Sequence, residues 1–197
     1  MTNLKTTFLK SLDRVDQIDY FDQTPEILML GRSNSGKSTL INNLTKSRQA
    51  KTSSKPGSTT CINFYQVEFL NEEQKEIRLI DFPGFGYAKF SKKKREEVSK
   101  NIIKILHERE NIKVCCLLID SKREPEIDEI SIVNTAFNNG IIVKIIITKL
   151  DRLNQKEKNK QIKLISSKLN LETTDLFKSD LKKTNYNKMF EDLVTLT

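Results

Sequence analysis

The sequence predicts an α/β fold in which a six-stranded, mostly parallel sheet with one antiparallel strand is covered by helices on both faces. Short apolar runs, such as 114–119 and 141–147, alternate with segments of helical periodicity, and this alternation is typical of parallel strands joined by crossover helices. The linker 71–75 is too short to hold a crossover helix, so the strands beside it are expected to form a hairpin. A chain of 197 residues can bury this sheet as one domain.

The expected elements follow one another in a regular order. A strand at 26–30 enters Gly31, and a helix follows Lys37. The hairpin strands are expected at 62–70 and 76–81, the later strands at 113–120, 141–147 and 175–178, and the later helices at 92–107, 126–137, 156–168 and 186–196. Ligands of such sheets bind at the carboxyl ends of the strands, so functional residues are expected in the loops that follow them.

The first residues of the chain have an apolar pattern of their own. Leu4, Phe8, Leu12 and Val15 lie at helical spacing, which favours an amphipathic helix over 4–18 that packs on the domain. We therefore expect a helical extension within residues 1–22 and a core domain at about 23–197.

Charge and composition restrict the class of protein. The net charge of +8 favours polyanionic partners, with the basic runs 92–95 and 156–163 as expected surfaces, but charge alone does not decide for RNA binding because Lys-rich helices are often only solvated. The apolar runs are far shorter than the roughly 20 residues of a membrane-spanning helix, and residues 1–10 show no secretory pattern. We expect a cytoplasmic protein without membrane contact.

A phosphate-binding loop is the strongest motif of the sequence. The pattern G-x-x-x-x-G-K-[ST] is matched after a strand and before a helix by Gly31, Arg32, Ser33, Asn34, Ser35, Gly36, Lys37 and Ser38. The two glycines permit a tight turn whose N–H groups face phosphates, the lysine reaches the β and γ oxygens, and the last serine can ligate Mg²⁺. The loop predicts a nucleotide site but does not choose between ATP and GTP.

A second motif favours guanine over adenine. Thr148, Lys149, Leu150 and Asp151 follow the strand 141–147 and match the [NT]-K-x-D pattern. A carboxylate at the last position accepts hydrogen bonds from N1–H and the 2-amino group of guanine, which adenine does not offer in that arrangement, while the lysine stem lies along the base. Together with the phosphate loop, this pattern predicts a GTP/GDP site, and a different P-loop enzyme such as an ATPase or nucleotide kinase is the nearer alternative.

Two further segments are expected to contact the γ-phosphate and Mg²⁺. The D-x-x-G element is formed by Asp81, Phe82, Pro83 and Gly84, where the carboxylate contacts the shell of Mg²⁺ through water and the glycine N–H senses the γ-phosphate. The irregular stretch before the hairpin supplies Gly57, Ser58, Thr59, Thr60 and Cys61. We favour Thr59 over Thr60 as the second Mg²⁺ ligand beside Ser38.

Taken together, GRSNSGKST, KPGSTTCINFY, DFPGFGYA and TKLD resemble, in order and spacing, the motifs of the EngB (YsxC/YihA) family of TrmE-Era-EngA-EngB-Septin-like P-loop GTPases. The match extends over roughly 20–195. The resemblance implies a three-layer P-loop GTPase domain without an appended RNA-binding domain. It also implies docking on the large ribosomal subunit during assembly, contact with rRNA, and a link to septation and cell division. We expect a monomer that does not bind DNA.

A last guanine contact and the rate of hydrolysis complete the expectations. Two segments could supply a backbone N–H that binds guanine O6: residues 166–168, within an expected helix, and Lys178, Ser179 and Asp180, after the final strand. Their position in the chain and the resemblance favour the second segment. Phe85 stands where many GTPases have a water-orienting Gln, so we expect slow hydrolysis supported by Lys37, Thr59 and Gly84, without an assigned catalytic residue. The related families imply K⁺ binding by Asn34. A non-hydrolysing RNA- or ribosome-binding adaptor is the more distant alternative.

Overall fold

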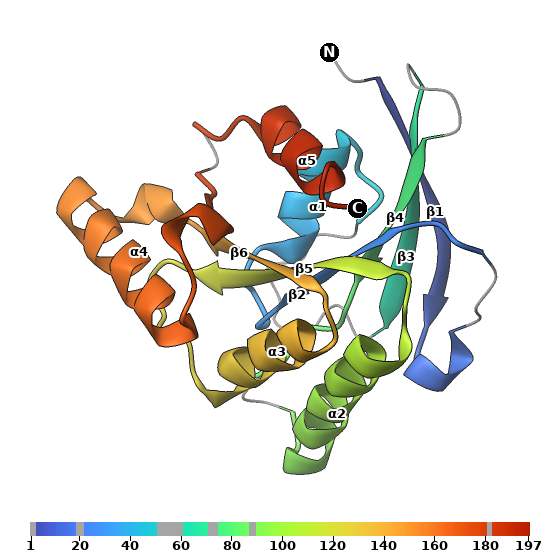
Figure 1. Ribbon diagram of the computed structural model, residues 1–197, viewed down its shortest axis with the longest axis horizontal. Helices are drawn as coiled ribbons and strands as arrows, with labels where there is room; N and C mark the ends of the chain where they lie inside the picture. Colours follow the sequence, from blue (N-terminus) through green and yellow to red (C-terminus); the bar gives the residue numbers. More distant parts are fainter. Residues whose placement is uncertain (1–2, 19–21, 51–60, 71–74, 87–89, 181–182) are drawn as a thin grey trace.

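Within the described residues, seven strands form one sheet that carries helices on both faces. The computed structural model describes residues 3–18, 22–50, 61–70, 75–86, 90–180 and 183–197. The strand order is β1-β3-β4-β2-β5-β6-β7, and β3 runs antiparallel to both of its neighbours while the other pairs are parallel (Figure 1). The α/β class and the antiparallel strand are confirmed, and the sheet has one strand more than predicted.

The elements begin and end close to the predicted residues everywhere except at the N-terminal segment. The strands are β1 Leu4–Leu12, β2 Glu26–Gly31, β3 Ile62–Phe69, β4 Glu76–Asp81, β5 Ile112–Asp120, β6 Ile142–Thr148 and β7 Leu176–Lys178. The helices are α1 Lys37–Thr45, α2 Lys92–Glu108, α3 Ile127–Asn138, α4 Gln155–Leu169 and α5 Tyr186–Val194, with short 3-10 turns η1 Val15–Gln17, η2 Leu150–Arg152 and η3 Thr173–Asp175.

The prediction of an N-terminal helix over 4–18 is wrong. Residues 4–12 form β1, which pairs with β3 from Leu4 opposite Phe69 to Leu12 opposite Ile62. A spacing of four residues fits one face of a helix, but any even spacing also fits one face of a strand, so the pattern alone could not separate the two. The strand is favoured because β3 would otherwise lie at the edge of the sheet with unpaired backbone groups, and β1 forms hydrogen bonds with them.

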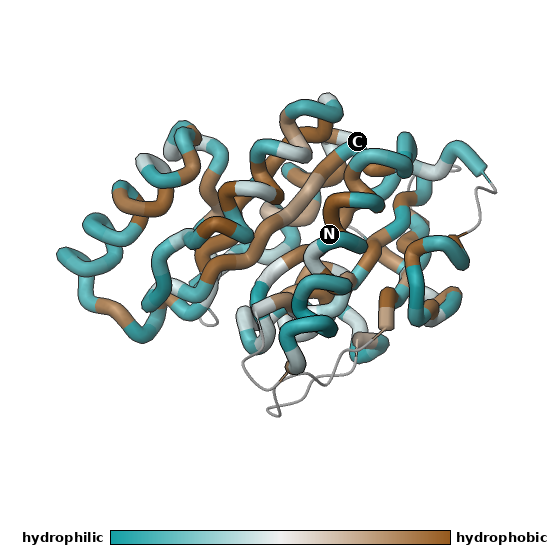
Figure 2. The backbone as a smooth tube through the Cα atoms, turned by 90° about the horizontal axis from the view of Figure 1, so that it is seen from below, coloured by the Kyte–Doolittle hydropathy of each residue, from teal (hydrophilic) through white to brown (hydrophobic). Residues whose placement is uncertain are grey.

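Two apolar cores lie on the two faces of the sheet. Along β2, Leu28 and Leu30 join the core under α2, α3 and α4, whereas Ile27 and Met29 join the core under α1 and α5. Figure 1 shows α1 and α5 on one side of the sheet and α2 and α3 on the other, and Figure 2 shows apolar residues along the central strands with hydrophilic residues on the outer helix turns. The strand period of two explains this division.

A buried cluster of charged side chains lies at the amino end of β2. Glu26 is fully buried and accepts hydrogen bonds from Arg109 Nη2 at 2.6 Å and from Arg78 Nη1 at 3.0 Å. Such a cluster fixes the end of the sheet remote from the phosphate loop. No helix of the described residues combines the length and the apolar character needed to cross a membrane.

Candidate functional site

The carboxyl ends of β2, β4, β6 and β7 carry most of the residues predicted to bind nucleotide. The phosphate loop begins at Gly31, the last residue of β2, and leads into α1 at Lys37, so the strand–loop–helix context expected from the sequence is present. Asp81 ends β4, Thr148 ends β6 and Lys178 ends β7. Because these strands run parallel, the loops that follow them meet at one edge of the sheet.

The phosphate loop has a backbone conformation that depends on its glycines. Gly36 adopts a φ of 96°, in the left-handed region that favours glycine, at the N-cap of α1. At Gly31 a Cβ would lie 2.6 Å from Ser35 Oγ and 2.9 Å from the carbonyl oxygen of Leu118, so a side chain has no room there. The two glycines of the motif are therefore required by the turn itself, and they leave the start of α1 open to an anion.

Lys37 and Asp81 face each other in the interior of the site. Both side chains are almost fully buried. Burial is the main cause of the two pKa shifts: it lowers the pKa of Lys37 and raises the pKa of Asp81 to about 6. The attraction between the two opposite charges offsets each shift only in part. Within the described residues, Asp81 Oδ1 and Ser35 Oγ are buried without a hydrogen-bond partner. Buried charges and orphaned acceptors of this kind fit a site that phosphates and Mg²⁺ complete.

The loop 82–86 lies directly against the phosphate loop. The backbone N–H of Ser33 donates to the Phe85 carbonyl at 3.0 Å, and that of Phe85 donates to the Gly31 carbonyl at 3.4 Å. A Cβ on Gly84 would come within 2.9 Å of Ser33 Cα, so only glycine permits this approach. Phe82 and Phe85 are buried, which places the Phe85 ring in the protein rather than beside the phosphates.

The guanine motif is bonded directly to the phosphate loop. Thr148 Oγ1 donates to the Ser35 carbonyl at 2.8 Å, and Lys149 Nζ donates to the Asn34 carbonyl at 2.6 Å and to Asp120 Oδ2 at 2.7 Å. Lys149 and Asn34 both have positive φ values, 58° and 65°. The structure therefore brings together two motifs that lie more than 100 residues apart in the sequence.

The segment 178–180 lies beside the guanine motif, as its position after the last strand predicted. The N–H of Ser179 donates to the Ile147 carbonyl at 2.8 Å, and the N–H of Leu150 donates to the Ser179 carbonyl at 3.3 Å. Thr184 Oγ1 accepts from the Asp180 N–H at 2.7 Å. The competing segment 166–168 lies within α4, so its backbone N–H groups belong to the helix.

Most of the remaining predicted residues lie in the described part of the chain, and four of them lie outside it. Ser38 is half-buried in the first turn of α1, Asp151 is exposed within η2, and Pro83 is buried before Gly84. Outside the described residues are Gly57, Ser58, Thr59 and Thr60, whereas Cys61 is half-buried and donates to Asp13 Oδ1 at 3.0 Å.

Sequence reasoning missed residues that support the site from neighbouring elements. Ser121 Oγ donates to the Lys149 carbonyl at 2.9 Å, and Asp120 pairs with the Lys149 ammonium. Asp120 ends the buried strand β5 and Ser121 follows it, and a polar pair at the carboxyl end of a buried strand was a usable signal. The contact of Thr184 had no such signal, because it depends on how the chain turns after β7.

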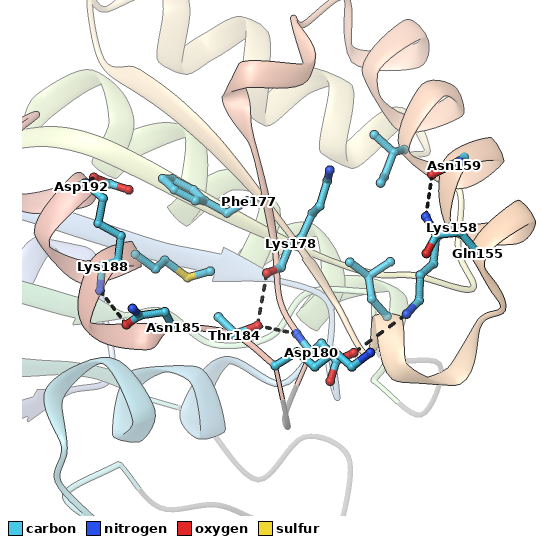
Figure 3. A pocket seen from close by; sticks show the side chains of 14 residues that line it. Gln155, Lys158, Asn159, Phe177, Lys178, Asp180, Thr184, Asn185, Lys188 and Asp192 are labelled. Carbon is cyan, nitrogen blue, oxygen red and sulfur yellow. Dashed lines mark hydrogen bonds and ion pairs between the residues drawn. The ribbon is translucent and has the colours of Figure 1, made fainter.

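A second hollow lies behind the segment 178–180, between α4 and α5. It has a volume of about 420 Å³. Figure 3 shows its labelled residues, with Lys158 directed toward Asp180 and Lys188 bonded on the α5 side. Its lining includes the apolar side chains of Phe177 and Met189 and has more lysines than carboxylates. These lysines add to the basic surface that α4 presents.

Comparison with known proteins agrees with this geometry. Residues 26–165 match the family described as "50S ribosome-binding GTPase". A "Probable GTP-binding protein EngB" of Campylobacter lari is 40% identical over 196 residues, 97% of this chain and 94% of that protein, and one of Latilactobacillus sakei is 42% identical over 157 residues, 79% and 76% of the two chains. This chain belongs to the EngB family of GTP-binding proteins. Its P-loop and its resemblance to the family are thus confirmed.

Solved structures show the same fold. A crystal structure of a "probable GTP-binding protein engB" superposes with a TM-score of 0.68 at 24% identity, covering 87% of this chain and 97% of that one. Era in complex with MgGDPNP and nucleotides of 16S ribosomal RNA superposes with a TM-score of 0.69 at 24% identity, covering 88% of this chain and 56% of that one. This chain therefore has a P-loop GTPase fold.

Proposed function

We propose that this EngB-family protein is a GTP-dependent switch that acts in assembly of the large ribosomal subunit. The observation that carries the proposal is the direct bonding of the guanine motif to the phosphate loop, through Thr148 to Ser35 and Lys149 to Asn34. One ligand that reaches both motifs has phosphates at one end and a base at the other. The description of the matched family as ribosome-binding supports the large subunit as the partner.

Each part of the site has a role in this proposal. The backbone of the phosphate loop and the Lys37 ammonium hold the phosphates, Ser38 and Thr59 ligate Mg²⁺, and Asp81 acts on the metal through water. Bound Mg²⁺ would offset the negative charge of the phosphates. Gly84 detects the γ-phosphate, while Asp151 and the backbone of 178–180 recognise guanine.

Hydrolysis is proposed to be slow and to need help. Phe85 is buried and has no group that could orient a water molecule. Asn34 is exposed on the phosphate loop, which supports a role in K⁺ binding, and a ribosomal partner would be the other source of acceleration. Single-turnover hydrolysis in K⁺ and in Na⁺ buffers tests the first route, and equal rates would exclude it.

A basic surface beside the site supports contact with rRNA. Exposed lysines gather at the start of α2 and along α4, and the lysines that line the hollow in Figure 3 extend this surface to α5. Polyanions bind such surfaces by release of counterions. We propose that the protein acts as a cytoplasmic monomer and that normal cell division and septation require it.

Sedimentation with purified large subunits tests the proposal, with Asp151→Asn as a matched variant. The wild-type protein should co-sediment with a non-hydrolysable GTP analogue and dissociate with GDP. Asp151→Asn should lose this response to guanine nucleotide and gain it with the matching xanthine nucleotide, because the amide can pair with the base oxygen at position 2. Preference of the wild type for ATP would favour a different P-loop enzyme, and ribosome binding without any turnover would favour the adaptor.

A further inference from the structure

The side chain of Arg32 connects the phosphate loop to the first turn of α3. Its Nε donates to Glu129 Oε1 at 2.6 Å, and its Nη2 donates to Glu126 Oε2 at 2.8 Å and to Glu129 Oε2 at 3.2 Å. The Arg32 side chain is 12% exposed and that of Glu129 is 4% exposed. A nearly dry two-point contact with Glu129, supported by the more exposed carboxylate of Glu126, holds the guanidinium in one place.

The opposite side of the same guanidinium lies against the loop 82–86. The guanidinium carbon is 5.6 Å from the centroid of the Phe85 ring. Gly86 has a φ of 65°, and a Cβ there would lie 2.6 Å from Arg32 Nη1, so the guanidinium occupies the space that a side chain would need. The backbone of Arg32 also forms a parallel bridge with Phe85.

The α3 end of this arrangement is fixed independently of Arg32. Glu129 Oε2 accepts from the backbone N–H of Glu126 at 3.1 Å, which completes a capping box at the start of α3. A side chain that caps its own helix and is buried cannot follow a moving loop without loss of these bonds. Arg32 is therefore anchored on α3, and a displaced loop 82–86 would lose its contact with the guanidinium.

We propose that Arg32 is a positioning residue that holds the loop 82–86 against the phosphate loop, with Glu126 and Glu129 of α3 as its anchor. The inference rests on the proposed function, in which the Gly84 N–H contacts the γ-phosphate. GTP requires the loop to be in place, whereas GDP has no γ-phosphate to contact it. Loss of the anchor therefore weakens binding of GTP more than binding of GDP.

A purely structural role of Arg32 gives a different pattern of results. It would lower the stability of the nucleotide-free protein and change the affinity for GDP and for a GTP analogue by the same factor. The ratio of the two dissociation constants is therefore the readout that separates positioning of the loop from general support of the fold.

The test compares Arg32→Lys and Glu129→Gln with Arg123→Gln as the matched control. Lysine keeps the charge but lacks the planar fork, and glutamine keeps the shape of Glu129 without its charge. Arg123 forms an exposed ion pair with Glu126 at 3.4 Å but comes from the segment that precedes α3, so its loss removes a surface ion pair only. Dissociation constants are measured by titration with fluorescent GDP and a fluorescent non-hydrolysable GTP analogue.

We expect both variants to raise the dissociation constant of the GTP analogue about tenfold, as loss of a charge-assisted hydrogen bond would, with that of GDP changed less than about twofold. Faster amide exchange in 84–86 in the analogue complex should accompany this change, and Arg123→Gln should show neither effect. If Arg32→Lys fails to fold, Glu129→Gln carries the same comparison with Arg32 intact. Equal changes for both nucleotides, or none, overturn the inference; a wild type that binds neither nucleotide overturns the proposed function as well.

Discussion

Replacement of Lys149 by methionine removes one of the two hydrogen bonds described between the guanine motif and the phosphate loop. The ammonium donates to the Asn34 carbonyl at 2.6 Å and to Asp120 Oδ2 at 2.7 Å, and the side chain is 23% exposed. Methionine keeps most of the apolar stem that can lie along a base. The variant therefore isolates the two hydrogen bonds from the packing of the stem.

The expected loss of affinity follows from the bond to Asn34. A hydrogen bond from a charged group contributes roughly 1.5–3 kcal/mol, so a phosphate loop without it should bind GDP roughly 10- to 150-fold more weakly. The bond to Asp120 affects stability instead. Burial is the largest single effect and acts to raise the pKa of Asp120, but the hydrogen bonds from the Lys149 side chain and the Lys122 backbone, together with the charges of Lys149 and Arg152, hold that pKa below its usual value. Lys149→Met thus leaves a partly buried carboxylate without its partner.

Titration with fluorescent GDP and urea unfolding measure the two effects separately. Adding Asp120→Asn to Lys149→Met should restore stability without restoring affinity, because it removes the isolated carboxylate but not the defect in the loop. Lys144→Met is the matched control. Lys144 lies on β6, the strand that Lys149 follows, and its 2.7 Å ion pair with Asp175 lies away from the phosphate loop. GDP binding by Lys149→Met within twofold of wild type would refute the reasoning.

Three further changes test other parts of the structure. Because burial raises the pKa of Asp81 to about 6, the charged form costs roughly 3 kcal/mol above pH 6, so Asp81→Asn should stabilise the nucleotide-free protein at pH 7.5. The gain should shrink as the pH falls from 6 to 4 and vanish only below the unfolded pKa of 3.8, where the carboxyl is protonated in both the folded and the unfolded state. Equal unfolding midpoints at pH 7.5 would contradict this. Gly84→Ala should displace the loop from Ser33 and weaken binding of a GTP analogue more than of GDP in the same titrations. Glu26→Gln should lower the free energy of unfolding by about 3–5 kcal/mol, since it removes the charge of a fully buried carboxylate that pairs with both Arg78 and Arg109; a loss under 1 kcal/mol in urea unfolding would contradict it.

The N-terminal segment shows where a sequence pattern reaches its limit. Leu4, Phe8 and Leu12 satisfy the spacing of a helix and of a strand at once, and nothing local separates the two. The segment forms a strand because the edge of β3, about 50 or more residues away in the sequence, offers unpaired backbone groups that it can bind. Among the six strands that the pattern did predict, β2, β5 and β6 consist mostly of apolar residues, which a strand buried on both faces requires in any context, whereas the three-residue β7 gave the weakest signal.

From residue 26 onward, the sequence by itself determined the order of strands and helices, the glycines of the phosphate loop and the nature of the ligand. These features depend on periodicity and on short motifs, which are local properties of the chain. Only the tertiary structure decided that Lys149 bonds to Asn34 and that Arg32 reaches Glu129, 97 residues further along. Such contacts depend on which strands become neighbours and on how each loop turns, and the spacing of residue types along the chain does not encode either one.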